Sequence, residues 1–200
     1  MLGLLFLQPY NIGINIEAFK LADSLASPGL NYIMALLAKS FFIVLPAIVL
    51  YMYFYKKDMN AYSFIIAGIV FYVVSDIIKN IVREPRPCNV SELSWINNVG
   101  CESTFSFPSN HASVLTGLAF FLKGYKYLRI AYVVWLLLIL FGRIYLGVHY
   151  FTDVIAGVVL SVVLYYVLSI YAKRINKFFN NLVGRIFPKI AIKSGGIDKK

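Results

Sequence analysis

The stretch AYSFIIAGIVFYVVSDIIKNIV, residues 61–82, decides the fold class. A membrane helix needs about 20 mostly apolar residues to cross about 30 Å of hydrocarbon, and this stretch supplies them. Its charged residues, Asp76 and Lys79, both stand in the last turns. A chain in lipid must satisfy its own backbone polar groups, so the stretch predicts a membrane-spanning α-helix with one polar end.

The composition of the whole chain agrees with a membrane protein. Hydrophobic residues make up 60% of its 200 residues, charged residues make up 14%, and the mean hydropathy is +0.74. A soluble domain is typically about 45–50% apolar and about 25% charged. The composition therefore excludes a water-soluble enzyme and a nucleic-acid-binding module, even though the formal net charge is +10.

Other apolar stretches qualify, or nearly qualify, as membrane helices. The third in chain order is the shortest, because Lys123 and Lys126 follow it closely. Together the stretches predict an all-α, polytopic membrane bundle of about five transmembrane helices. The expected spans are Ala35–Tyr55, Ala61–Val82, His111–Leu122 (or to about Tyr127), Leu128–Tyr145 and Asp153–Ala172.

A short interfacial helix is expected before the first span. Apolar residues recur there at helical spacing, interrupted by Ile16 and Phe19, and the turn Ser27-Pro28-Gly29 ends the helix. The apolar stripe consists of Ile14, Ala18, Leu21, Ala22 and Leu25. Before it, Met1–Tyr10 has no basic region and contains Pro9, so we expect no cleavable signal peptide.

Basic residues are concentrated on one side of the expected bundle. Positively charged loops stay in the cytoplasm, so the opposite side, where the second and fourth spans end, faces outward. This predicts a multi-pass cell-membrane protein with one membrane-embedded domain, residues 1–172, and a basic cytoplasmic tail, residues 173–200. The cytoplasmic group is Lys56, Lys57, Lys123, Lys126, Arg129, Lys173, Arg174, Lys177, Arg185, Lys189, Lys193, Lys199 and Lys200.

The outward side collects three polar segments, which include both histidines of the chain. Plainer interpretations exist: Lys79 and Arg86 as surface anchors, Ser109 as a helix N-cap, and a local hydrogen bond between His149 and Asp153. Ionisable residues at membrane depth are functional by default, and the convergence of three segments favours a functional site. The segments are KNIVREPRP (79–87), FPSNH (107–111) and GRIYLGVHYFTD (142–153).

The cations among these residues suit an anion with several oxygens. Arginine binds phosphate through two parallel hydrogen bonds and lysine acts as a point charge, which favours a phosphate site at Lys79, Arg86 and Arg143. Ser109 and the backbone N–H of Asn110 add an anion seat at a helix N-terminus.

The two histidines allow a division of labour between nucleophile and general acid. Asp153 can hold the tautomer of His149 and stabilise its positive charge, whereas His111 has no carboxylate near it in sequence. The pattern predicts phosphoryl transfer through a phosphohistidine. No cluster of acidic, histidine or cysteine residues in the sequence has the ligand count of a metal site, so no metal or cofactor is expected.

The spacings Lys-x6-Arg-Pro, Pro-Ser-x-His and Arg-x5-His-x3-Asp resemble the three-part signature of the type 2 phosphatidic acid phosphatase family, over about Ala61–Ala172. The resemblance implies a helical-bundle membrane phosphatase. The implied phosphate-binding residues are Lys79, Arg86, Ser109, Asn110 and Arg143, and the implied catalytic residues are His149 (nucleophile), Asp153 (its partner) and His111 (acid).

The chain departs from the family pattern at two positions. Asn110 stands where the family usually has glycine, which keeps the N–H but changes the pocket shape. Gly142 stands where the family often has serine, which loses a hydroxyl contact. Neither change removes a catalytic group.

The resemblance points to small polyprenyl diphosphate phosphatases, which act on a lipid carrier in the bilayer. Phosphatidylglycerophosphate, phosphatidic acid and lipid A phosphatases share the same motifs and remain alternatives. A lipid phosphotransferase and a non-catalytic lipid-binding protein are alternatives of other classes. No nucleic-acid partner is expected, and the sequence does not set the oligomeric state.

Cys88 and Cys101 flank the middle of a loop of roughly 25 residues, and such long loops are often functional. On the outward side a disulfide between them would persist and would order the link between Arg86 and His111. Two free thiols are the equally weighted alternative.

Overall fold

The computed structural model describes residues 12–97 and 100–192. The expectation for Met1–Tyr10 and the end of the basic tail lie outside these residues. All secondary-structure elements in the described residues are helices, which confirms the all-α prediction. The α-helices are α1 (Gly13–Ser24), α2 (Pro28–Lys39), α3 (Phe41–Leu50), α4 (Asn60–Val82), α5 (Asn110–Phe121), α6 (Lys126–Tyr145) and α7 (Phe151–Ile186).

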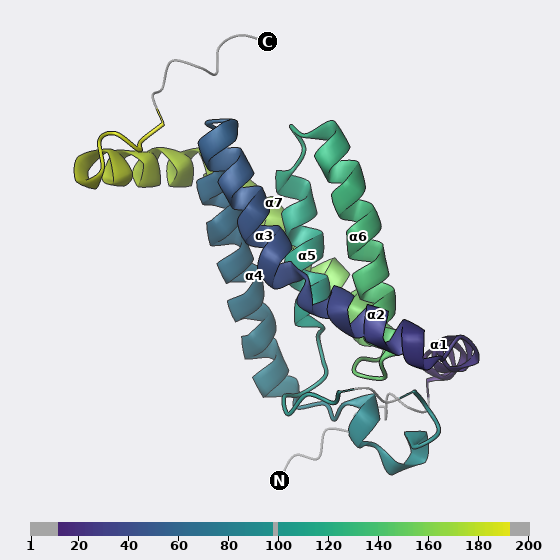
Figure 1. Ribbon diagram of the computed structural model, residues 1–200. Helices are drawn as coiled ribbons and strands as arrows, with labels where there is room; N and C mark the ends of the chain where they lie inside the picture. The colour runs from purple at the N-terminus through teal and green to yellow at the C-terminus, as the bar shows by residue number, and fades with distance from the viewer. Residues whose placement is uncertain (1–11, 98–99, 193–200) are drawn as a thin grey trace.

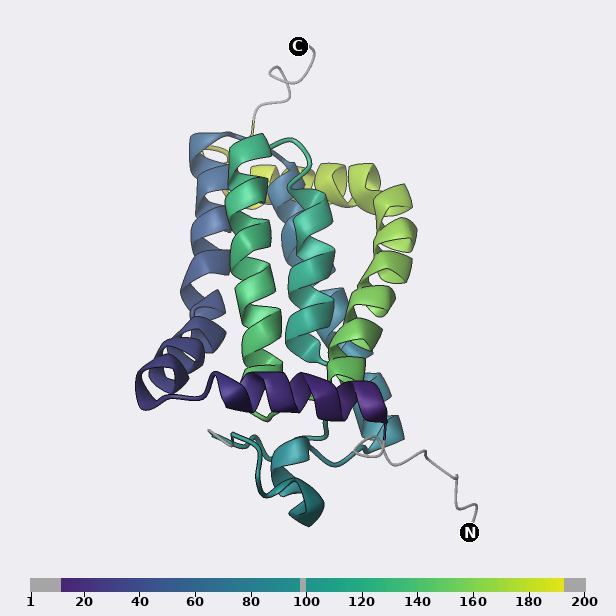
Figure 2. The ribbon, with the colours of Figure 1, turned by 90° about the vertical axis from the view of Figure 1, so that its right-hand side faces the viewer.

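The helices α3 to α7 form an upright bundle, with α1 and α2 crossing its lower end (Figures 1 and 2). In the described part of the chain, four helical segments are long and apolar enough to cross a membrane. The predicted membrane bundle is therefore present, but the predicted third span, α5, has only 12 residues and is not one of the four. The four segments are Pro28–Tyr55, Asn60–Asn89, Lys126–Tyr145 and Phe151–Ile186.

Helix α5 is short because it is enclosed by protein. It packs chiefly against α7 and α4, and Leu115 and Leu118 are buried in the main core between these helices. At Gly157 of α7 an added Cβ would lie 2.7 Å from the carbonyl oxygen of Ser109 and 2.8 Å from Cβ of Ala112. The missing side chain thus lets α7 approach the N-terminus of α5, where the second sequence motif lies.

The predicted first span is divided into two helices. The expected turn at Ser27 is present, since its hydroxyl accepts a hydrogen bond from the Leu30 backbone N–H and Pro28 begins α2. Helix α2 then ends at Lys39, and α3 starts after Ser40 and continues as a π-helix, Tyr51–Tyr55. From the sequence, Lys39 is expected close to the end of one span, whereas in the structure Lys39 ends α2 at the division itself.

The predicted interfacial helix is α1, but its buried face differs from the predicted stripe. Phe19, which interrupts the stripe, is only 1% exposed, whereas Ile14 and Leu21 are 54% and 61% exposed. Asn15 lies on the buried face, where its side chain hydrogen-bonds to Thr152 of α7. Ile14, Leu21 and Leu25 of the predicted stripe therefore face away from the protein, as a helix in the lipid interface requires, whereas Ala22 is buried against the bundle.

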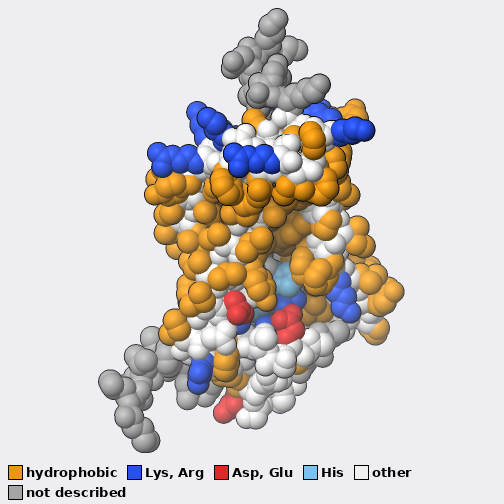
Figure 3. All heavy atoms as spheres, turned by 90° about the vertical axis from the view of Figure 1, so that its left-hand side faces the viewer, with side chains coloured by type: hydrophobic (Ala, Val, Ile, Leu, Met, Phe, Trp, Pro, Cys, Tyr) orange, Lys and Arg blue, Asp and Glu red, His pale blue; other side chains and the backbone are white. Residues whose placement is uncertain are grey.

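The two ends of the bundle differ in charge. Basic side chains gather at one end, above a broad hydrophobic band (Figure 3). Helix α7 does not stop at Ala172 but continues across this end to Ile186 (Figures 1 and 2). Its Asn176 is buried and accepts hydrogen bonds from the Ser63 backbone N–H (3.0 Å) and hydroxyl (2.5 Å), which fixes this part of the predicted tail against α4.

Candidate active site

His149 and Asp153 lie together at the start of α7. After α6, Gly147 adopts a φ of 65°, a conformation that glycine accepts readily, and the chain turns so that His149 enters the bundle. Asp153 is fully buried and its Oδ2 lies 3.2 Å from His149 Nδ1. The same oxygen accepts hydrogen bonds from Ser106 Oγ (2.5 Å) and Tyr150 N–H (3.0 Å).

This arrangement fixes the state of the His149 ring. We assign the proton to Nδ1, because Nδ1 faces the Asp153 carboxylate, which leaves Nε2 without a proton. Nε2 then accepts a hydrogen bond from Arg86 Nη1 at 3.2 Å. Burial, and then the positive charges of Arg143, Arg86 and Lys79, hold the pKa of His149 well below its usual value. A neutral imidazole with an unprotonated Nε2 is a competent nucleophile.

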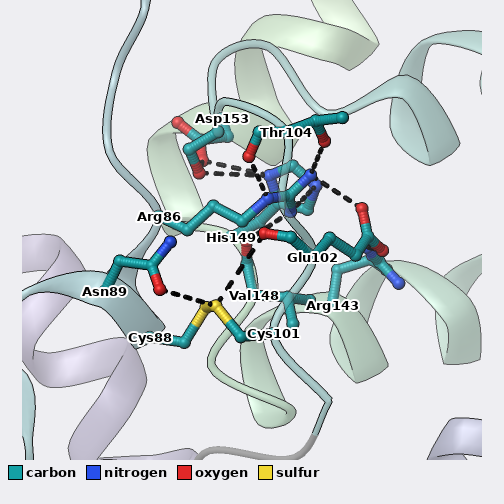
Figure 4. Close-up of a disulfide and its surroundings, with 11 residues drawn as sticks. Arg86, Cys88, Asn89, Cys101, Glu102, Thr104, Arg143, Val148, His149 and Asp153 are labelled. Atoms are coloured by element: carbon teal, nitrogen blue, oxygen red, sulfur yellow. Dashed lines mark hydrogen bonds and ion pairs between the residues drawn. A yellow bond between two sulfur atoms is a disulfide. The ribbon is translucent and has the colours of Figure 1, made fainter.

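The three cations of the predicted phosphate site are buried and close to His149. Lys79, at 2% exposure, donates to the carbonyl oxygens of Phe105 (2.7 Å) and Ser106 (2.9 Å). Arg86 donates to the carbonyl of Val148, which precedes His149, and to both oxygens of Thr104 (Figure 4).

Arg143 reaches the same region from the last turn of α6. It is 4% exposed and its guanidinium pairs with Glu102, which also pairs with Arg86 at 2.7 Å (Figure 4). The structure thus brings Lys79, Arg86 and Arg143 together around one histidine; their role in binding phosphate stays a prediction.

The second motif lies at the start of α5, where Ser109 contacts α5 itself and Asn110 contacts α4. Ser109 caps α5 by accepting a hydrogen bond from Ala112 N–H (3.4 Å). This contact is the helix N-cap that the sequence analysis gave as the plainer interpretation of Ser109. The side-chain oxygen of Asn110 accepts from Ser75 Oγ (2.8 Å), which ties it to α4.

His111 is the candidate acid, and its ring is held from the α2–α3 side. It packs edge-on against Phe41, with ring centroids 4.9 Å apart, and hydrogen-bonds to the backbone of Ala38. Its Nε2 is buried and has no hydrogen-bond partner among the described residues. That nitrogen is therefore available to a substrate atom.

The site also contains polar residues that the sequence motifs do not identify. Glu102, Thr104 and Ser106 come from the outer loop, and each touches a motif residue. Glu84, from the segment that follows α4, lies beside the Asp153 carboxylate. The positive φ of Arg83 (56°) ends α4 and turns Glu84 toward Asp153.

The outer loop is closed on itself beside Arg86. Cys88 and Cys101 are joined by a disulfide with their Cα atoms 5.9 Å apart (Figure 4). The bridge places residue 102 next to Arg86, which follows the expectation that ordering this loop organises the site. The state of these cysteines in the isolated protein stays a prediction.

A polar cavity of about 470 Å³ opens at the site from the side of the bundle. Figure 3 shows a histidine at the bottom of a hollow in the hydrophobic band, with acidic and basic side chains beside it. Through Phe41 and His111 this cavity adjoins a small apolar one, which shares Leu45, Tyr72 and Val114 with a groove of about 510 Å³ between α3 and α4. The polar site is thus continuous with an apolar groove on the membrane-facing side.

Comparison with known proteins agrees with this geometry. Residues 60–177, which contain all three motifs, match the family described as the PAP2 superfamily. The chain belongs to the PAP2 superfamily. The resemblance of its three motifs is thereby confirmed, and the match covers α4 to the middle of α7.

Named PAP2 relatives are membrane lipid phosphatases. Undecaprenyl-diphosphatase of Sulfolobus acidocaldarius is 27% identical over 151 residues, covering 74% of this chain and 73% of the relative. Phosphatidylglycerophosphatase B of Bacillus subtilis is 30% identical over 178 residues, covering 80% and 83%. The crystal structure of Aquifex aeolicus LpxE has a TM-score of 0.70 at 22% identity, over 80% of this chain and 98% of that one, which supports the fold.

Among residues 12–97 and 100–192, no group of three or more histidine, cysteine or acidic side chains is placed to hold a metal ion. The arrangement at His149 can instead bind a phosphate through cations and donors. The imidazole nitrogen of His149 can also attack the phosphorus atom of that phosphate.

Proposed function

We propose that this PAP2 protein hydrolyses a phosphate or diphosphate monoester of a membrane lipid through a phosphohistidine at His149. The observation that carries the proposal is the contact of Asp153 with His149 Nδ1, which directs the unprotonated Nε2 toward Arg86, one of three buried cations. Lys79, Arg86 and Arg143 hold the phosphate, together with Ser109 and the backbone of Asn110.

The first step breaks the bond between the terminal phosphorus and the oxygen that links it to the rest of the lipid, which is the bridging oxygen in a diphosphate and the ester oxygen in a monophosphate. His149 Nε2 attacks phosphorus, and His111, protonated on Nε2, gives its proton to the departing oxygen. The imidazole ring that now carries the phosphoryl group is positive, and Asp153 stabilises it. In the second step His111 takes a proton from water, the water oxygen attacks phosphorus, the N–P bond breaks, and phosphate leaves.

We propose a polyprenyl diphosphate as the substrate. The apolar groove that adjoins the polar cavity suits a lipid whose head group reaches His111 while its chain stays among the helices. The name of the Sulfolobus relative supports this choice. Phosphatidylglycerophosphate is the second candidate, supported by the name of the Bacillus relative.

The unequal charge of the two bundle ends supports an orientation in the cell membrane. The end that carries the basic residues and the last turns of α7 faces the cytoplasm, and the site faces outward. The membrane-embedded domain then ends near residue 172, and the following basic residues form the cytoplasmic tail.

A phosphate-release panel in detergent tests the proposal. It compares polyprenyl diphosphate, phosphatidylglycerophosphate, phosphatidic acid and a lipid A precursor, each with and without EDTA. We expect polyprenyl diphosphate to be hydrolysed fastest, with activity retained in EDTA and inhibited by vanadate. Loss of activity in EDTA that magnesium restores would overturn the mechanism, and faster release from another lipid would overturn the substrate.

A further inference from the structure

Glu102 lies between Arg86 and Arg143 and forms a salt bridge with each. Its Oε2 accepts from Arg86 Nη2 at 2.7 Å, and its Oε1 accepts from Arg143 Nη2 (Figure 4). In the described part of the chain, it is the carboxylate that forms salt bridges with these two guanidinium groups. One carboxylate therefore bridges two cations that come from different motifs, Arg86 from the loop after α4 and Arg143 from the last turn of α6.

The partners in this bridge differ in freedom. The side chains of Arg86 and Arg143 are 1% and 5% exposed, whereas that of Glu102 is 41% exposed. Glu102 comes from the outer loop and lines the polar cavity together with His111 and Arg143. The two cations are thus fixed in the protein, and the carboxylate is the member that can move into the cavity.

A carboxylate and a phosphate present similar oxygens to a guanidinium group, and both form charge-assisted hydrogen bonds with it. A phosphate that contacts Arg86 and Arg143 together must take the place of the Glu102 carboxylate, because two anions at one position repel each other. Burial raises the pKa of Glu102, but the nearby Arg143 and then Arg86 outweigh this and hold it below its usual value. The resident group is therefore ionised at neutral pH.

We propose that Glu102 is a resident anion of the phosphate site, which orients Arg86 and Arg143 in the empty site and is displaced by each incoming phosphate. This inference rests on the proposed function. It gives Glu102 two effects: it keeps two buried guanidinium groups paired when no substrate is bound, and it lowers the affinity for phosphate. The second effect favours release of the product.

Isothermal titration of the detergent-solubilised, full-length protein with orthovanadate and inorganic phosphate tests the proposal without turnover. The main variant is Glu102→Gln, which removes the charge but keeps the shape. Glu92→Gln is the matched control, because Glu92 lies on the same outer loop and its exposed side chain accepts a hydrogen bond from the neighbouring Ser91 hydroxyl (2.8 Å). If the open site is populated at about 10%, removing the competitor should tighten binding by about tenfold.

We expect Glu102→Gln to bind both anions about tenfold more tightly than the wild type, and Glu92→Gln to bind them like the wild type. In turnover, Glu102→Gln should lower KM and become more sensitive to inhibition by phosphate. Equal or weaker anion binding by Glu102→Gln would overturn the role of Glu102 while leaving the phosphate site in place. Absence of vanadate binding to both the wild type and the variant would overturn the proposed function itself.

A second variant keeps the test decisive if Glu102→Gln does not fold. Glu102→Asp retains the charge, but its side chain is one methylene shorter and cannot bridge both arginines as Glu102 does. It should bind vanadate more tightly than the wild type, and binding at or below the wild-type affinity would contradict the proposal.

Discussion

Replacing Asp153 with asparagine isolates the contribution of its charge to phosphoryl transfer. In the structure, Oδ2 of Asp153 contacts Ser106 Oγ, Tyr150 N–H and His149 Nδ1. Asparagine has nearly the same shape and keeps an oxygen that can accept from the first two donors. It has no charge to offset the positive ring of His149, so kcat should fall about 10²–10⁴-fold, or about 2.7–5.4 kcal/mol of lost transition-state stabilisation.

The assay is steady-state phosphate release in detergent, with kcat and KM determined separately and thermal unfolding recorded for each variant. Asp23→Asn is the control, since Asp23 is exposed on α1. We expect KM and the unfolding temperature of Asp153→Asn to stay close to the wild type, because Glu84 can accept a hydrogen bond from the new amide. Wild-type kcat in Asp153→Asn would refute the role of this carboxylate.

Three further predictions concern the surroundings of the site. Glu84→Ala should lower kcat because it removes the polar side chain that lies against the Asp153 carboxyl group, and Glu84→Gln should restore most of the loss; equal defects in both variants, measured by phosphate release, would contradict this. Gly157→Ala should lower the free energy of unfolding by about 1–3 kcal/mol through overpacking against α5. Gly184→Ala should not lower it, because the nearest atom to the added Cβ is 3.5 Å away. Chemical denaturation of both variants measures the difference. Mass spectrometry of protein alkylated without reduction should show Cys88 and Cys101 bridged, and two alkylated cysteines would contradict that expectation.

The motif residues could be predicted from the sequence because each motif is local. Lys79 stands in the last turn of one span and Arg86 just after it, and His149 and Asp153 stand four residues apart at the start of another span. Their spacing alone therefore brings them to one end of the bundle. The structure adds the distances between the motifs. These distances depend on the close packing of α5 against Gly157 of α7.

Glu102, Thr104 and Ser106 could not be predicted in the same way. They belong to a loop without periodicity, and their contacts with Arg86 and Asp153 depend on the path of that loop. The proximity of Glu102 to Cys101 was the one available signal, because a bridge to Cys88 brings the neighbouring residue close to Arg86.

The N-terminal helix shows a second limit of pattern analysis. Its apolar stripe identified an interfacial helix, but periodicity does not distinguish a face that meets lipid from a face that meets protein. Phe19 and Asn15 are buried because α1 packs across the ends of α6 and α7. That contact is tertiary, and the sequence of α1 alone does not contain it.

Peptide mapping of the phosphorylated intermediate tests the central claim most directly. The protein is mixed with substrate carrying a ³²P-labelled terminal phosphate, quenched in base within milliseconds, digested and analysed for acid-labile label. The account predicts label on the peptide that contains His149, and none in His149→Ala, which should also lose turnover. Label on another residue, or wild-type turnover by His149→Ala, would contradict it.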